Sequence, residues 1–347
     1  MPQKISAFVL HKPKDMRLEM VDMPAPGPNE VLVRMKAVGV CGSDVHYYQT
    51  GRIGPFIVKK PLILGHESSG EVVQVGRDVS DFNPGDRVAF EPGYPCRTCD
   101  YCKVGRYNLC LNMTFMATPP VDGALVEYVT FPPDFLYKIP DSLSYQEATL
   151  MEPLAVGIHA ARRSGISPGD SVLVLGAGPI GLMVMQVVKS MGATQIIVTD
   201  ILKNRLGLAA ALGATHVLNA KEDDPSPRVK ELTNEKGPKV IFETAGTIPT
   251  IQAAIRLAQR GGTVVLIGLP STNEFPLGVV EAVAKELDIK TVFRYANVFR
   301  QAVDLIARGF INTKSMITHE FPFDKTVEAF ELSDNEKDKA VKVVINL

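Results

Sequence analysis

The strongest constraint on the fold is a glycine-rich segment inside a long apolar stretch, SVLVLGAGPIGLMVMQVV from Ser171 to Val188. The stretch is long enough to cross a membrane as a helix, but glycines and a proline divide it. A strand, a tight turn and a helix therefore fit better than one continuous helix. Gly176, Gly178 and Gly181 have the G-x-G-x-x-G spacing with which such a turn binds a dinucleotide pyrophosphate at a helix N-terminus.

A second apolar strand, QIIVTD, ends in Asp200, about 20 residues further on. An acidic side chain at that point can bind both ribose hydroxyls and repel a 2′-phosphate, which favours NAD over NADP. We also expect Pro179 and Ile180, at the start of the helix, and Arg205 to contact the cofactor. If the glycine turn were purely structural, the position of an acidic residue at Asp200 would be a coincidence.

Two domains are expected from the pattern along the chain. Strands alternate with helices from Ser171 onward, which predicts a doubly wound parallel sheet of the Rossmann type over residues 157–296, with its last strand, DIKTVF, near a sheet edge. Short strands and turns up to about residue 140 predict an all-β, barrel-like domain. A helix begins where Ser144 and Glu147 form a capping box, and we place the boundary beyond it. The tail has a helix and strands that we expect to rejoin the first domain, which then comprises residues 1–156 and 297–347.

Composition excludes several classes of partner. The 347 residues include 37 lysines and arginines against 38 aspartates and glutamates, and no block of like charge would follow a phosphate backbone or a lipid surface. We therefore expect neither a nucleic-acid nor a membrane partner. An N-terminus without a signal peptide and an odd number of cysteines, five, indicate a reducing cytoplasm.

Four of those five cysteines lie in one short segment, PCRTCDYCKVGRYNLC. Four thiolates can enclose a tetrahedral zinc ion with no open position, as in structural zinc sites. An iron–sulfur cluster is the rival interpretation, because the first three spacings also suit cluster binding. Four unrelated buried thiols are a poor explanation of such clustering. The candidate ligands are Cys96, Cys99, Cys102 and Cys110.

A second group of candidate metal ligands is spread along the chain. Cys41, His66, Glu67 and Glu152 offer thiolate, imidazole and carboxylate donors, which suit a catalytic zinc that keeps one position open. Their spacing alone does not distinguish a metal site from a core cysteine and a surface carboxylate. Because neighbouring side chains of a strand point to opposite faces, Glu67 is the less obvious ligand beside His66 unless the segment turns there.

The order of these motifs resembles that of the zinc-dependent medium-chain alcohol dehydrogenases. The segments that carry the resemblance are GVCGSDVHYYQTGRIG, LILGHESSGEVVQVG, PGDRVAFEPG, the four-cysteine segment, ATPPVDGA, EPLAVGIHA, GAGPIGL and FRYAN. They run nearly from end to end, and within the family the chain looks most like the polyol branch, the sorbitol dehydrogenases. The resemblance implies a GroES-like β-barrel catalytic domain built from both ends of the chain, a Rossmann domain between them, and a homotetramer.

The resemblance also assigns roles to the candidate ligands. Cys41, His66 and Glu67 match the catalytic zinc ligands of the polyol branch, and Glu152 matches a carboxylate that reaches the metal directly or through water. The choice between Glu67 and Glu152 stays open. Some animal members lack the structural-site cysteines, whereas all four are present here, so two zinc ions per chain are expected.

The activity that follows from the resemblance is oxidation of a secondary hydroxyl of a polyol, such as sorbitol or xylitol, to the ketose, with hydride transfer to NAD. Ser43 and His46 match residues that relay the hydroxyl proton to solvent; without the resemblance they would be a turn residue and a surface histidine. The residues expected to form the polyol pocket are Tyr47, Phe56, Phe115, Arg294 and Tyr295.

Three alternative functions fit parts of the pattern. A threonine dehydrogenase would share the zinc loops and the glycine motif but need a different pocket. A zinc-free quinone reductase would lack the metal ligands that are present here. A non-enzymatic, zinc-stabilised binding protein would need a basic surface on the four-cysteine segment, which instead mixes Arg97, Lys103 and Arg106 with Asp100.

Overall fold

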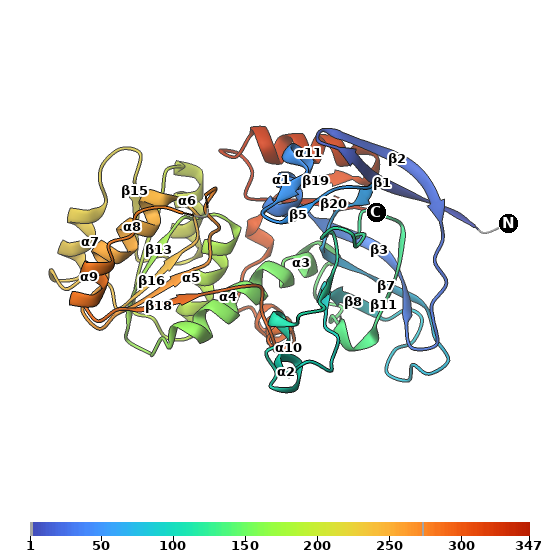
Figure 1. Cartoon of the computed structure of the whole chain (residues 1–347), viewed down its shortest axis with the longest axis horizontal. Coiled ribbons are helices and arrows are strands. Elements are labelled where there is room, and N and C mark those ends of the chain that lie inside the picture. Colours follow the sequence, from blue (N-terminus) through green and yellow to red (C-terminus); the bar gives the residue numbers. More distant parts are fainter. Residues whose placement is uncertain (1–2, 273) are drawn as a thin grey trace. The chain divides into compact units, whose positions relative to one another are not determined.

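The structure is a computed structural model that describes residues 3–272 and 274–347 (Figure 1). It divides into two compact units. The first contains the chain up to Glu152, Phe299–Ala307 and Ile317–Leu347. The second contains Pro153–Val298 and Arg308–Met316.

The first unit is built on a seven-stranded sheet in the order β12-β8-β7-β3-β20-β19, with β11 also paired to β3. Smaller sheets are formed by β2-β1-β6, β10-β9 and β4-β5. The strands are β1 (Lys4–Lys12), β2 (Asp15–Asp22), β3 (Val31–Gly39), β4 (Arg52–Ile53), β5 (Phe56–Ile57), β6 (Leu62–Ile63), β7 (Glu67–Val75), β8 (Arg87–Phe90), β9 (Gly93–Tyr94), β10 (Thr114–Phe115), β11 (Tyr128–Phe131), β12 (Leu136–Lys138), β19 (Ile317–Pro322) and β20 (Lys342–Asn346).

Strand β20 joins the sheet from the far end of the chain. It pairs antiparallel with β3, opposing Val344 to Gly39, and β3 in turn opposes Gly39 to Glu67 of β7. The tail therefore rejoins the first unit, as the sequence predicted. Apolar side chains that alternate along these strands pack into one core, whose fully buried members include Val33 and Phe90.

Among the described residues, six helices belong wholly or partly to this unit. They are α1 (Gly42–Thr50), α2 (Asp100–Lys103), α3 (Tyr145–Thr149), α4 (Met151–Ser164), α10 (Phe299–Ala307) and α11 (Thr326–Asn335). Short 3-10 helices span Tyr107–Leu109, Pro133–Phe135 and Phe323–Lys325, and a fourth, Lys314–Met316, is in the second unit. The predicted capping box forms at the start of α3, where Ser144 Oγ accepts from the Glu147 backbone N–H at 3.1 Å.

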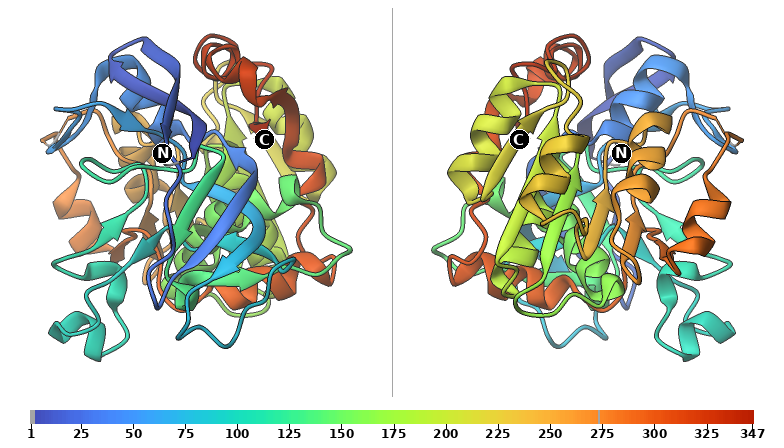
Figure 2. Two further views of the ribbon diagram at one scale, coloured as in Figure 1. Left: turned by 90° about the vertical axis from the view of Figure 1, so that its right-hand side faces the viewer. Right: turned by 90° about the vertical axis from the view of Figure 1, so that its left-hand side faces the viewer.

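The second unit is a six-stranded sheet whose adjacent strands are all parallel, in the order β15-β14-β13-β16-β17-β18. Numbered from β13, this is the 3-2-1-4-5-6 order of the Rossmann fold, and β18 lies at the predicted sheet edge. Helices pack against the sheet (Figure 2). The elements are β13 (Ser171–Leu175), β14 (Gln195–Asp200), β15 (His216–Asn219), β16 (Val240–Glu243), β17 (Thr263–Leu266), β18 (Asp288–Thr291), α5 (Pro179–Ser190), α6 (Lys203–Leu212), α7 (Ser226–Leu232), α8 (Ile248–Leu257) and α9 (Val279–Ala284).

The apolar stretch from Ser171 divides into strand β13 and helix α5, as its glycines predicted. Within the described residues, no helix has both the length and the apolar character needed to cross a membrane.

The sequence interpretation was wrong about some elements. The first unit is not all β before residue 140, because α1 follows Cys41, and α11 was not predicted. The segment KSMITHEF is a strand only from Ile317, since its first residues form a 3-10 helix. In α1 only Asp44, Val45, Tyr47 and Tyr48 are buried, and this polar, tyrosine-containing turn lacks the apolar periodicity that marks an amphipathic helix.

Candidate active site

Cys41 lies where strand β3 ends and helix α1 begins. It is the N-cap of α1, and the carboxylate of Asp44 accepts from its backbone N–H at 3.4 Å. The other oxygen of Asp44 accepts from the backbone N–H of Gly65 at 3.2 Å. Asp44 is only 1% exposed, so it holds the Cys41 and Gly65 loops together inside the unit.

Asp44 also orients the neighbouring histidine. Its Oδ2 lies 3.3 Å from Nδ1 of His66, which leaves Nε2 as the nitrogen available to a metal. Burial opposes a charge on His66, but Asp44 and Cys41 outweigh it and raise the pKa of His66 well above its usual value. The sequence analysis did not find Asp44; its spacing from Cys41, three positions as in a capping box, was the available signal.

Glu67 joins Cys41 and His66 although it is adjacent to His66 in sequence. Gly65 has φ +89°, a conformation that favours glycine, and β7 begins only at Glu67, so His66 lies outside the alternation of the strand. One donor atom from each of Cys41, His66 and Glu67 lies within 4.8 Å of the others. Thiolate, imidazole and carboxylate at this separation are a donor set that fits a catalytic zinc ion.

A buried lysine borders this cluster. Lys342 of β20 forms an ion pair with Glu67 Oε2, and its Nζ also donates to the Val40 carbonyl at 3.2 Å. Burial lowers the pKa of Lys342, but the nearby charges of Glu67 and Cys41 more than offset this and raise it. No local sequence signal indicates this contact, because lysine is rarely fully buried and the partners are far apart in the chain.

The fourth candidate ligand, Glu152, lies in the first turn of α4 and is 7% exposed. It contributes to the electrostatic environment of Lys342, so it belongs to the same charged, buried region. The cluster of three donors contains Glu67 and not Glu152.

Helix α1 carries three of the predicted site residues. Ser43 is partly buried, His46 is exposed and Tyr47 is buried. Phe115, from β10, lies with its ring centroid 5.7 Å from that of His66, so it borders the donor cluster.

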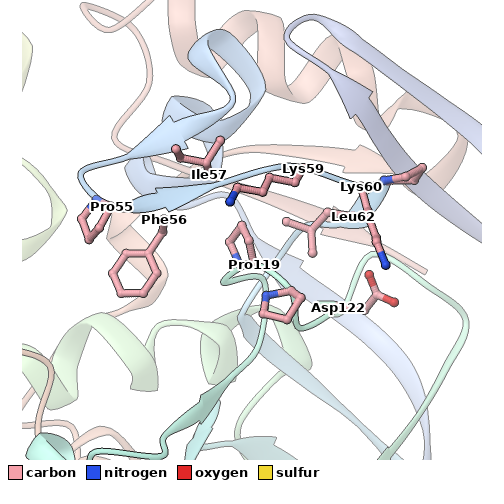
Figure 3. A pocket seen from close by; sticks show the side chains of 10 residues that line it. Pro55, Phe56, Ile57, Lys59, Lys60, Leu62, Pro119 and Asp122 are labelled. Atoms are coloured by element: carbon pink, nitrogen blue, oxygen red, sulfur yellow. The ribbon is translucent and has the colours of Figure 1, made fainter.

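Phe56 lines a different part of the first unit, a cavity of about 440 Å³. Figure 3 shows Phe56 beside Pro55 and Pro119, with Lys59 on the same cavity. The predicted pocket residues Arg294 and Tyr295 belong to the second unit. Arg294 has φ +54° and its guanidinium lies 4.9 Å from the centroid of the Phe293 ring, while Tyr295 is buried.

The four clustered cysteines converge around α2. Their Sγ–Sγ distances are 3.4 Å for Cys99–Cys102, 3.9 Å for Cys99–Cys110 and 4.0 Å for Cys96–Cys102. A tetrahedral zinc with Zn–S bonds of about 2.3 Å needs sulfurs about 3.8 Å apart, so the set fits one zinc ion. A multinuclear iron–sulfur cluster is disfavoured, because its four thiolates are divided between two or more irons and so lie farther apart.

Hydrogen bonds favour the thiolate form of one of these cysteines, Cys96. Cys96 Sγ accepts from the Thr98 hydroxyl at 3.5 Å and from the Cys99 backbone N–H at 3.4 Å. These bonds, with that of Thr98 first, lower the pKa of Cys96 to about 5, which favours the thiolate that binds metal.

The glycine-rich turn packs closely and leaves a cradle of open space at the N-terminus of α5. Gly176 has φ +102°, and a Cβ there would approach the Ala245 backbone nitrogen to 3.0 Å. A Cβ on Gly181 would lie 1.9 Å from the Gly176 carbonyl oxygen, so only glycine allows this packing. At Gly178, the N-cap of α5, the nearest atom would be Arg205 Nη1 at 3.8 Å, which leaves space at the helix N-terminus.

Asp200 and Arg205 border that cradle. Asp200 ends β14, and its carboxylate accepts from the backbone N–H groups of Ala177 at 2.7 Å and Leu202 at 2.9 Å. The Nε of Arg205 is buried without a hydrogen-bond partner. A buried, unpaired guanidinium donor beside an open helix N-terminus fits an anionic cofactor, because such a donor requires an acceptor. Pro179 and Ile180 form the first turn of α5 beside it.

One buried acid outside the predicted site is notable. Glu91 follows β8 and accepts from the hydroxyls of Tyr107 at 2.6 Å and Tyr137 at 2.9 Å. Burial raises the pKa of Glu91 to about 7, partly offset by the two tyrosines and increased by Glu152. Tyr107 lies between Cys102 and Cys110, so Glu91 ties the four-cysteine segment to the barrel.

Comparison with known protein families gives two matches. Residues 27–141 match the alcohol dehydrogenase GroES-like domain, and residues 179–308 match the zinc-binding dehydrogenase domain.

Curated proteins and solved structures match over nearly the whole chain. Sorbitol dehydrogenase of Bacillus subtilis is 45% identical over 99% of this chain and 98% of its own length. Sorbitol dehydrogenase of Bos taurus is 48% identical over 99% of this chain and 96% of its own. A crystal structure of an Escherichia coli oxidoreductase/dehydrogenase of unknown specificity has a TM-score of 0.96 at 41% identity, covering 99% of both chains.

Proposed function

Because the chain belongs to the zinc-binding alcohol dehydrogenases, we propose that it is a zinc- and NAD-dependent polyol dehydrogenase that oxidises a secondary hydroxyl to a ketone. The convergence of Cys41, His66 and Glu67 in one buried cluster carries this proposal. Its relatives named sorbitol dehydrogenase support a polyol such as sorbitol or xylitol as the substrate.

Binding of the substrate hydroxyl and acceptance of the hydride would depend on two different groups, the metal and the nicotinamide. When bound, zinc supplies Lewis-acid stabilisation of negative charge on the substrate hydroxyl oxygen, and the nicotinamide ring accepts the hydride. Cys41, His66 and one carboxylate would hold the metal, with Asp44 fixing the imidazole through Nδ1. We assign the carboxylate to Glu67, because its oxygen lies in the donor cluster, and leave Glu152 as the neighbouring charge.

Helix α1 offers a route for the hydroxyl proton. Ser43 is partly buried one turn from His46, which is exposed, so a proton passed from the first to the second reaches solvent. Replacing His46 by Gln should lower turnover chiefly at low pH, with partial rescue by small buffer bases. An unchanged pH profile would contradict this role.

The polyol would lie between the metal and nearby aromatic and polar groups. Phe115 borders His66, and Tyr47 is buried on α1 behind Cys41. Phe56 is a further proposed substrate residue of the first unit. Arg294 and Tyr295, which belong to the second unit, stay predictions from the sequence.

Two zinc ions and NAD are the proposed cofactors. The four-cysteine set has the sulfur separations of a closed tetrahedral site, which suits a structural zinc. Asp200 at the end of β14 favours the free ribose hydroxyls of NAD over the phosphate of NADP, and the unpaired Nε of Arg205 suits the anionic part of the cofactor. Free thiols in such proximity suit a reducing compartment, and we propose the cytoplasm.

A homotetramer is the proposed assembly, and the edge of the parallel sheet offers one contact face. Strand β18 is an edge strand, and apolar side chains are exposed on it and on α9, the helix before it: Val280 is 85% exposed, Val283 75% and Ile289 40%. Replacing Val280 and Val283 by glutamate should lower the mass measured by light scattering. A paired change of the exposed Leu18 and Met20 to glutamate should leave it unchanged.

The decisive experiment measures NADH formation with sorbitol, xylitol, threonine and ethanol, with NADP in parallel, before and after zinc is removed and restored. We expect polyol-dependent turnover that needs NAD and zinc. If only threonine is turned over, the metal assignment stands and the substrate assignment changes from a polyol to threonine. No turnover of any alcohol by the zinc-loaded protein would overturn the proposal.

A further inference from the structure

The pair between Lys342 and Glu67 crosses three adjacent strands. Lys342 begins β20, Glu67 begins β7, and Gly39 ends β3 between them, opposite both Val344 and Glu67. A Cβ on Gly39 would lie 2.4 Å from Glu67 Oε2 and 3.0 Å from Lys342 Cε. The absence of a side chain at this one position therefore makes room for the two charged groups to meet.

Both partners are almost completely removed from water. The side chain of Lys342 is 1% exposed and that of Glu67 is 2% exposed. Charges buried to this degree need a partner, and each of these two groups is the partner of the other. The Lys342 ammonium is further held by the Val40 carbonyl, the residue before Cys41.

The same carboxylate belongs to the candidate metal cluster with Cys41 and His66. The Glu67 carboxylate therefore lies between the Lys342 ammonium and the candidate metal site. Three protein ligands leave one position of a four-coordinate catalytic metal open. A Glu67 carboxylate that bound through both oxygens would fill that position, and the ion pair with Lys342 engages its Oε2. A positive charge beside the site also repels a divalent cation.

We propose that Lys342 is a positioning residue that competes with the catalytic metal for the Glu67 carboxylate, and so keeps a coordination position open for the substrate hydroxyl. This inference rests on the proposed function, since it requires zinc at Cys41, His66 and Glu67. This role is opposite to that of a residue that only supports the structure of the metal site. Replacing a supporting residue should make the enzyme release zinc more easily, whereas replacing Lys342 should make the enzyme bind zinc more tightly.

The test measures zinc release from the zinc-loaded enzyme into an excess of a coloured chelator. The variants are Lys342→Met, which removes the charge, Lys342→Arg, which keeps it, and Lys339→Met as the matched control. Lys339 pairs with Glu336 at the surface, where its side chain is 65% exposed. Release from the four-cysteine site is the internal reference within every sample.

We expect Lys342→Met to slow release of the catalytic zinc about tenfold or more, because one repulsive charge is lost and Glu67 is freed to bind the metal. The polyol KM should rise, while release from the four-cysteine site stays as in the wild type. Lys342→Arg and Lys339→Met should behave as the wild type. The double variant Lys342→Met/Glu67→Gln should lose the slow release, because that release requires the Glu67 charge.

Unchanged or faster release of the catalytic zinc from Lys342→Met would overturn the inference. If Lys342→Met does not fold, Lys342→Gln decides, since its amide still donates a hydrogen bond to Glu67 but carries no charge. A wild-type enzyme that holds no zinc outside the four-cysteine site would instead refute the proposed function. The zinc content of the wild type therefore separates the two failures.

Discussion

Replacing Glu91 by Gln should remove a pH dependence of stability that this one buried acid creates. Burial raises the pKa of Glu91 from 4.5 to about 7 in the folded protein. An acid whose pKa is raised stabilises the fold while it is protonated, and this contribution is lost as the pH rises through the folded value. The difference of about 2.5 pKa units corresponds to roughly 3 kcal/mol, at about 1.4 kcal/mol per unit.

Glutamine keeps the shape of the protonated acid and can still bond to Tyr107 and Tyr137, but it does not titrate. Between about pH 4 and about pH 8, the unfolding free energy of the wild type should therefore fall by roughly 3 kcal/mol relative to the variant. Thermal unfolding of both proteins across this range measures the difference. Glu328→Gln, at an exposed carboxylate, is the matched control. Parallel curves for the wild type and Glu91→Gln would refute the reasoning.

Three further substitutions test the two cofactor sites. Cys102→Ser should lower the zinc content from about two ions per chain to about one and reduce thermal stability, with NADH binding retained; metal analysis of the purified protein checks this. Asp200→Asn should weaken NADH binding about tenfold or more through loss of charged hydrogen bonds, measured by cofactor fluorescence, with NADPH affected less. Gly176→Ala should cost about 1–3 kcal/mol of stability, because its φ of +102° is unfavourable for alanine, and weaken NADH binding; wild-type values would contradict the tight turn.

Much of the second unit could be predicted from the sequence because its signals are local. The glycine spacing around Gly176 and the acid at Asp200 lie within one strand–helix–strand unit, and the structure places them at one cradle. The alternation of strands and helices also predicted the parallel sheet and its edge strand. The four-cysteine cluster could also be predicted from the sequence, because all four cysteines lie in one short segment.

The environment of the catalytic cluster was harder to predict because it depends on strand pairing between distant segments. Lys342 and Val40 lie 302 positions apart, and nothing near Lys342 in the sequence distinguishes it from an exposed lysine. Asp44 and Glu91 act through buried contacts with other loops, which periodicity does not encode. Helix α1 was missed because Cys41 is an unusual N-cap and few of its residues form an apolar stripe.

The position of β20 in the sheet also imposes an order on biosynthesis. Strands β3 and β7, with Cys41, His66 and Glu67, leave the ribosome before the whole parallel-sheet unit is made, and β20 follows only afterwards. During translation the nascent barrel therefore has an open edge on β3 and a Glu67 carboxylate without its lysine. Free zinc can therefore reach Cys41, His66 and Glu67 before Lys342 does.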